Sequence, residues 1–153
     1  MPSSKVKPAN ISGDAFELAS GLDSNHPPLR LLVIEDDSLI LKLYSDVLMR
    51  SGYHVDTAED GAAGWEALDA AHSAFRNYDL LLTDNSMPKM TGVELIARLR
   101  SKNMDLPVIL ATGMAPANIE HLRLSAILEK PFSMAELLGK VEEVLEGTAR
   151  CRA

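Results

Sequence analysis

The sequence predicts an α/β domain built on a parallel β-sheet, and three observations lead to this class. Short, continuous apolar runs recur along the chain, as they do in strands that are covered on both faces. Between these runs, apolar residues repeat at the helical spacing of i, i+3, i+4 and i+7. Strand and helix patterns alternate about five times between 29 and 146, which is typical of parallel sheets with right-handed crossovers.

The first strand and helix of this series have clear limits. Strand 31–34 reads Leu-Leu-Val-Ile, and the apolar stripe from Ile40 to Leu48 predicts the helix after it. Gly52 is placed to end that helix in the left-handed conformation. The later elements are, in chain order, strand 53–57, a helix whose face is marked by Trp65, Leu68 and Phe75, strand 80–83, helix 91–100, strand 108–111, a short helix at 119–124, strand 126–128 and a helix from 134 onward.

Two of these helices begin at a capping box, in which a Ser or Thr hydroxyl and a Glu three residues later satisfy each other's backbone N–H groups. Thr91 and Glu94 form the first, and Ser133 and Glu136 form the second. Both pairs fix where a helix starts, and so they also fix where the preceding loop ends.

The chain divides into three zones. Residues 1–28 are rich in Ser, Pro, Asn and Gly, and we expect a flexible tail or linker. The regular pattern of 29–146 predicts one domain, and 147–153 is expected to be a short tail. A length of 153 residues suits one domain with its own core.

Composition excludes several classes of function. The net charge of −7 argues against direct binding to nucleic acid or to an anionic membrane, because both need a basic surface. The single cysteine excludes an internal disulfide framework. No apolar run reaches the ~20 residues of a membrane-spanning helix, and no secretory signal is visible, so we expect a cytoplasmic protein.

Polar residues with complementary chemistry stand at the ends of four predicted strands. Glu35 and Asp36 follow the first strand, Asp84 the third, Thr112 the fourth and Lys130 the last. Because the carboxyl ends of parallel strands meet at one edge, these side chains are expected to converge there. Clustered carboxylates call for a hard cation such as Mg²⁺. An acid at a strand end is often only a helix cap, but the joint occurrence of acids, hydroxyl and amine indicates phosphoryl chemistry.

Four segments carry a resemblance to a known family. The stretches 31–37, 79–92, 107–113 and 130–132 resemble the receiver domain of two-component response regulators, over about 29–146 of the chain. The resemblance implies a flavodoxin-like, doubly wound sheet of five parallel strands in the order 2-1-3-4-5. It also makes Asp84 the phosphoacceptor.

The resemblance further implies a ligand set around Asp84. Glu35, Asp36, Asp84 and the backbone carbonyl of Ser86 would hold Mg²⁺, for which Mn²⁺ can substitute. The Thr112 hydroxyl would bond a phosphoryl oxygen. Lys130 would pair with the phosphoryl group, and the peptide bond between Lys130 and Pro131 would be cis.

The chain departs from the family pattern at positions that tune the response. Ile127 stands where the family often has an aromatic switch residue, and the stretch 112–130 is short by about one helical turn of ~3.6 residues. In the family, hydrolysis of the phosphorylated aspartate uses a water that can be held by the side chains two positions after the phosphoacceptor and two after the threonine. In this chain those positions are Ser86 and Met114. Methionine cannot orient a water, so we expect a long-lived phosphorylated state.

These observations predict a phosphoacceptor receiver domain rather than an enzyme. A sensor histidine kinase or histidine phosphotransfer protein would phosphorylate Asp84, and signalling would pass through contacts with an unknown downstream protein. We expect no DNA-binding output domain in this chain, although a receiver taken from a larger hybrid kinase is an alternative. An aspartyl-phosphate phosphatase of the haloacid dehalogenase type needs an acid where Ser86 stands. A phosphate-blind interaction module would be expected to lack one of the acids or the lysine.

Overall fold

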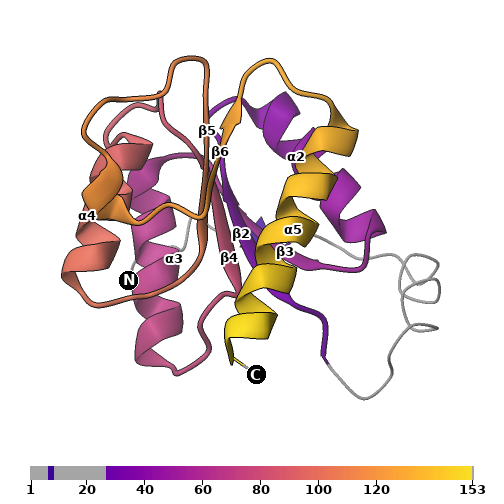
Figure 1. Cartoon of the computed structure of the whole chain (residues 1–153), viewed down its shortest axis with the longest axis horizontal. Helices are drawn as coiled ribbons and strands as arrows, with labels where there is room; N and C mark the ends of the chain where they lie inside the picture. The colour runs from indigo at the N-terminus through magenta and orange to yellow at the C-terminus, as the bar shows by residue number, and fades with distance from the viewer. Residues whose placement is uncertain (1–6, 9–26, 153) are drawn as a thin grey trace.

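The computed structural model describes residues 7–8 and 27–152 of the chain, with side chains considered from 27 to 148. Most of the segment that we expected to be a flexible tail therefore lies outside the described residues. The described residues form a sheet flanked by two layers of helices (Figure 1).

The five predicted strands form a parallel sheet in the spatial order β3-β2-β4-β5-β6. This confirms the predicted doubly wound fold, since the order along the sheet is 2-1-3-4-5 when the parallel strands are counted alone. The strands are β2 (Arg30–Ile34), β3 (His54–Ala58), β4 (Leu80–Asp84), β5 (Val108–Thr112) and β6 (Ala126–Glu129).

A sixth strand, which the sequence pattern does not predict, extends the sheet. This is β1 (Lys7–Pro8), which pairs antiparallel with β3 so that Lys7 lies opposite Thr57 and Pro8 opposite Asp56. The expected five-stranded sheet is therefore the parallel part of a six-stranded one. A two-residue strand containing a proline has no alternating pattern, and this explains why periodicity does not reveal it.

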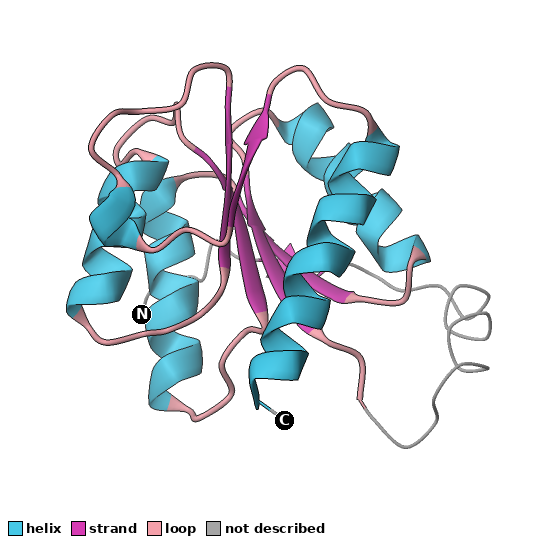
Figure 2. Ribbon diagram, in the orientation of Figure 1, coloured by secondary structure: helices cyan, strands magenta, loops and turns pink. Residues whose placement is uncertain are grey.

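Helices cover both faces of the sheet, as Figure 2 shows. One face is covered by α2 (Ser38–Arg50) and α5 (Met134–Arg152), and the other by α3 (Gly61–Ser73), α4 (Gly92–Ser101) and the 3₁₀ turn η1 (Glu120–Leu122). Helix α5 continues past Glu146, where the sequence pattern stops being regular.

Alternate residues of each strand enter the two cores. Leu31 and Val33 pack with α2 and α5, whereas Leu32 and Ile34 pack with α3 and α4, and all four are at most 1% exposed. This double burial explains the continuous apolar runs in the sequence. It also fixes the register, so that the polar residues after the strands share one edge.

The predicted apolar face of helix α3 is wrong at Phe75. Helix α3 ends at Ser73, and Phe75 lies in the turn beyond it, with φ 56° and 92% of its surface exposed. Its backbone N–H donates to the carbonyl of His72, so the chain has already left the helical path. Trp65 and Leu68 do face the core as expected.

Other local predictions are confirmed. Gly52 follows α2 with φ 98°, and both capping boxes form, with the hydroxyls of Thr91 and Ser133 accepting from the backbone N–H groups of Glu94 and Glu136. The short helix expected at 119–124 is only the single 3₁₀ turn η1. None of the helices within 27–152 combines the length and the apolar character that a membrane span requires.

Candidate functional site

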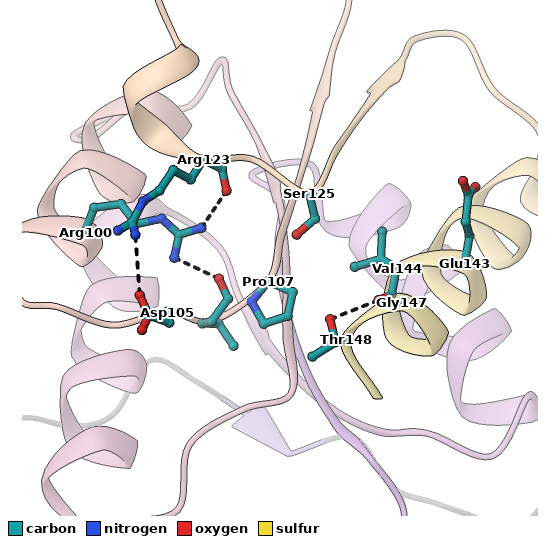
Figure 3. A pocket seen from close by; sticks show the side chains of 10 residues that line it. Arg100, Asp105, Pro107, Arg123, Ser125, Glu143, Val144, Gly147 and Thr148 are labelled. Carbon is teal, nitrogen blue, oxygen red and sulfur yellow. Dashed lines mark hydrogen bonds and ion pairs between the residues drawn. The ribbon is translucent and has the colours of Figure 1, made fainter. Parts of the chain in front are cut away.

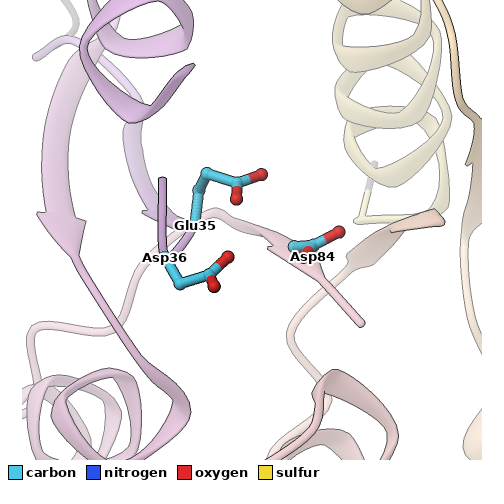
Figure 4. A group of neighbouring side chains, drawn as sticks. All are labelled: Glu35, Asp36 and Asp84. Carbon is cyan, nitrogen blue, oxygen red and sulfur yellow. The ribbon is translucent and has the colours of Figure 1, made fainter. Parts of the chain in front are cut away.

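Three carboxylates meet at the carboxyl edge of the sheet. Glu35 and Asp36 directly follow β2, and Asp84 is the last residue of the neighbouring β4. One carboxylate oxygen from each of the three lies within 4.8 Å of the others. Figure 4 shows the three side chains beside one another at two neighbouring strand ends. The structure therefore assembles the predicted acidic group.

Lys130 brings a positive charge to the same place from the loop after β6. Its Nζ lies 2.7 Å from Oδ1 of Asp84 and 3.5 Å from Oε1 of Glu35. Its backbone N–H donates to the Thr112 carbonyl at 2.9 Å, which ties this loop to the end of β5. The Lys130–Pro131 peptide bond is cis. The predicted lysine thus contacts the predicted phosphoacceptor directly.

Burial controls the electrostatics of this group. Glu35 is 2% exposed and Asp84 5%, whereas Asp36 is exposed. Burial raises the pKa of Glu35, although the backbone N–H of Asp37 donates to its carboxylate at 3.2 Å and opposes this effect. Burial by itself would lower the pKa of Lys130, but the hydrogen bond and charge of Asp84 outweigh it and raise that pKa. The ammonium therefore stays charged beside Asp84.

The third acid after β2 has a different role. Asp37 is the N-cap of α2, and its Oδ1 accepts from the backbone N–H groups of Leu39 and Ile40 at 3.0 and 3.3 Å. Helix α2 therefore begins immediately after the acidic pair. This placement holds Glu35 and Asp36 at the sheet edge, with no flexible connection between strand and helix.

Thr112 and Ser86 reach the site edge without bonding to the acids. Thr112 is 4% exposed at the end of β5, and its hydroxyl donates to the carbonyl of Met114 at 2.9 Å and accepts from the Met114 N–H at 3.2 Å. Ser86 is exposed in the loop after β4. Ile127, half-buried on β6, belongs to the sheet rather than to this group.

Asn85, in the loop after β4, and Gly92, the first residue of α4, support Asp84, although the sequence pattern did not single them out. The side-chain oxygen of Asn85 accepts from the Val93 N–H at 3.0 Å, and so anchors the loop to the first turn of α4. Gly92 lies so close that an added Cβ would be 2.4 Å from the Asp84 carbonyl oxygen. In the sequence, the threonine cap Thr91 followed directly by Gly92 was the signal from which this close approach could have been predicted.

A hollow lies at the opposite end of the sheet, among the residues that precede β5 and β6. Its volume is about 560 Å³, and Figure 3 shows Arg100 and Arg123 on one side and α5 on the other. The Arg100 guanidinium donates to the carbonyls of Met104, Leu106, Leu122 and Arg123, at 2.8 to 3.1 Å. Four of its five N–H groups therefore hold two loops together.

The fold and the carboxyl-edge site define the class: a flavodoxin-like domain with a candidate metal centre of three carboxylates beside a lysine. The family model for the response regulator receiver domain matches residues 31–142. The chain belongs to this receiver-domain family of the response regulators of two-component systems.

Relatives and solved structures agree with this assignment. The response regulator receiver protein CpdR of Brucella abortus is 32% identical over 120 residues, covering 76% of this chain and 96% of CpdR. The transcriptional regulatory protein CusR of Escherichia coli is 34% identical over 124 residues, but this chain covers only 51% of it. The chain thus spans nearly all of one relative and about half of the other.

Two solved structures illustrate the likeness in fold. A CheY-like receiver domain protein from Methanospirillum hungatei aligns with a TM-score of 0.73 and 25% identity, over 80% of this chain and 98% of that one. TrrA from Thermotoga maritima, solved in complex with Mg²⁺ and BeF, aligns with a TM-score of 0.67 and 30% identity, over 76% and 98% of the two chains.

Proposed function

We propose that this chain is a phosphoacceptor module in which Asp84 accepts a phosphoryl group from a sensor histidine kinase or a histidine phosphotransfer protein. The observation that carries the proposal is the 2.7 Å contact between Lys130 Nζ and Asp84 Oδ1, beside two further carboxylates. Membership of the receiver family supports it.

The transfer itself is a simple displacement. A carboxylate oxygen of Asp84 attacks the phosphorus of the donor phosphohistidine, so that an O–P bond forms while the P–N bond breaks. The electron pair of the broken bond stays on the imidazole nitrogen, which takes up a proton. Lys130 offsets the negative charge of the phosphoryl oxygens from its position against Asp84. Thr112 contributes a hydrogen bond once its hydroxyl leaves the Met114 carbonyl.

The donor set fits a hard divalent cation. Three carboxylates whose oxygens lie within 4.8 Å of one another suit Mg²⁺, or Mn²⁺ in its place. The ion would be held by Glu35, Asp36, Asp84 and the backbone carbonyl of Ser86. Because Asp36 is exposed, its carboxylate could release bound water and take up the ion in its place. The ion would neutralise charge on the phosphoryl oxygens. The related TrrA was solved as a complex with Mg²⁺ and BeF, and this supports the choice of metal.

Signalling, in this proposal, passes through protein contacts rather than through catalysis on a substrate. The chain would phosphorylate itself from a donor and lose the group slowly, so it is not an enzyme with turnover. The net charge of −7 supports a module that binds neither nucleic acid nor an anionic membrane directly, and we place it in the cytoplasm as part of this proposal.

Mass spectrometry tests the proposed phosphoacceptor. Incubation with phosphoramidate and Mg²⁺ should add one phosphoryl group to the wild-type protein and none to Asp84→Asn. Asp69→Asn, which changes an exposed acid on α3, is the matched control and should be modified like the wild type. Equal modification of Asp84→Asn and wild type would refute the assignment.

A further inference from the structure

A buried tyrosine on α2 lies next to the phosphorylation machinery and has no role in the proposal so far. Tyr44 is 6% exposed and belongs to the core between α2, α5 and the sheet. Its ring stacks on the ring of Phe132, with centroids 5.6 Å apart and planes inclined by 28°. Aromatic pairs in this offset arrangement attract each other beyond the area that they bury. This contact joins the first helix of the domain to the loop that carries the lysine.

The loop with Lys130 is short and held at both ends. Only 130–133 separate the end of β6 from the start of α5. On the strand side, the Lys130 N–H donates to Thr112 O. On the helix side, Ser133 accepts from the Glu136 N–H and Phe132 packs against Tyr44. The position of the Phe132 ring therefore restricts the backbone from which the lysine side chain extends.

The charged residues of the site also act on Tyr44. Burial raises the pKa of Tyr44, and the charges of Lys130, Glu35 and Asp84 all act on it. The Lys130 side chain is 31% exposed, so the protein does not enclose it completely. A long, partly exposed side chain needs a fixed base in order to keep its ammonium group at one carboxylate.

We propose that Tyr44 is a positioning residue, whose ring holds Phe132 and thereby keeps the Lys130 ammonium in place against Asp84. This inference rests on the proposed function, and it adds a residue on α2 to a site otherwise built at strand ends. Because α2 starts directly after the acidic pair, one helix fixes the acids and, through Tyr44, the lysine.

Two substitutions separate the ring from the hydroxyl. Tyr44→Leu removes the ring and should slow phosphorylation by phosphoramidate at saturating Mg²⁺ by about tenfold, because small displacements of a reacting group have large effects on rate. Tyr44→Phe keeps the ring and should stay within about twofold of the wild type. Mg²⁺ affinity, measured by calorimetry, should be unchanged in both, since neither carboxylates nor carbonyl are altered. Phe132→Leu should reproduce the loss if Tyr44→Leu fails to fold.

Leu48→Ala is the matched control for a merely structural effect. Leu48 is fully buried on the same helix and in the same core, and its truncation should lower stability while the folded protein keeps the wild-type rate. An equal loss of rate in Leu48→Ala and Tyr44→Leu would overturn the proposal. So would a wild-type rate in Tyr44→Leu, or the same loss in Tyr44→Phe, which would assign the effect to the hydroxyl.

Hydrogen exchange gives a readout that does not depend on phosphorylation. The amide of Lys130, measured relative to the amides of β4, should exchange faster in Tyr44→Leu than in Leu48→Ala or wild type. Unchanged exchange would overturn the positioning role even if Asp84 is phosphorylated. An unphosphorylated wild type with faster exchange in Tyr44→Leu would instead overturn the proposed function and leave the packing role supported.

Discussion

Replacing Gly92 with alanine tests how closely α4 must approach the strand that carries Asp84. The new Cβ would lie 2.4 Å from the Asp84 carbonyl oxygen and 3.0 Å from the Asn85 Cα, while ordinary contact begins near 3.4 Å. The backbone at this point must therefore move by about 1 Å, the difference between 3.4 and 2.4 Å. The shortest of these contacts is to a backbone atom, so rotation of the nearby Leu110 side chain, whose Cδ1 would lie 3.0 Å away, cannot relieve it.

The expected net effect follows from two opposing contributions. Overpacking of this kind destabilises by about 1–3 kcal/mol. Alanine is favoured over glycine inside a helix by at most about 1 kcal/mol, and this offsets part of the loss. We therefore expect Gly92→Ala to lower the free energy of unfolding by about 1–2 kcal/mol. Phosphorylation should also slow, because the displaced carbonyl belongs to Asp84.

Gly139→Ala provides the matched control within the same chain. Gly139 is an exposed residue of α5, and an added Cβ would meet nothing within 4 Å. That variant should be stabilised by about 0.5–1 kcal/mol. In urea, with a slope of ~2 kcal/mol per M, the unfolding midpoints of the two variants should differ by about 1 M. A Gly92→Ala midpoint equal to or above that of Gly139→Ala would refute the argument from close approach.

Three further outcomes are expected. Asp36→Ala should weaken Mg²⁺ binding in calorimetry, because it removes a charge and a ligand, and an affinity equal to the wild type would exclude this residue from the metal centre. The pKa of all three tyrosines is raised by burial, most for Tyr78, whose hydroxyl also donates to Asp56 at 2.7 Å. The folded state thus keeps phenolic protons that the unfolded chain loses, so the free energy of unfolding should fall as pH rises above ~10. It should fall less steeply with pH in Tyr78→Phe than in the wild type. Equal slopes in the two proteins would contradict this explanation. The phosphorylated protein should lose its phosphoryl group faster in a Ser86→Asn, Met114→Glu double variant. The reason is that Met114, 83% exposed at the site edge, offers no donor to the water that hydrolyses the phosphorylated aspartate. An unchanged rate of loss would show that these side chains do not set the rate.

Much of the architecture was predictable because the cores impose a repeating pattern on the sequence. Strands buried on both faces leave continuous apolar runs, and helices leave stripes, so the parallel order and the shared edge could be predicted before any contact was known. The site residues Glu35, Asp84 and Lys130 were predictable because each directly follows or ends a strand, where topology alone brings them together.

What could not be predicted depends on single torsions and on contacts between distant segments. Phe75 has the spacing of a core residue, but the helix ends two residues earlier and the ring points into solvent. The Thr112 hydroxyl bonds within its own loop, which depends on one side-chain rotation. The stacking of Tyr44 on Phe132 joins residues far apart in sequence, and no local pattern records it.

The short strand β1 has a consequence for how separate molecules meet. Without it, β3 would present an open row of backbone donors and acceptors, and such edges pair readily with the edge of another chain. The other border of the sheet is protected differently, because β6 is only four residues long, ends at the exposed acid Glu129 and is followed closely by Pro131. A chain that began after residue 8 would keep every residue of the proposed phosphorylation site and yet be more prone to edge-to-edge aggregation at high concentration.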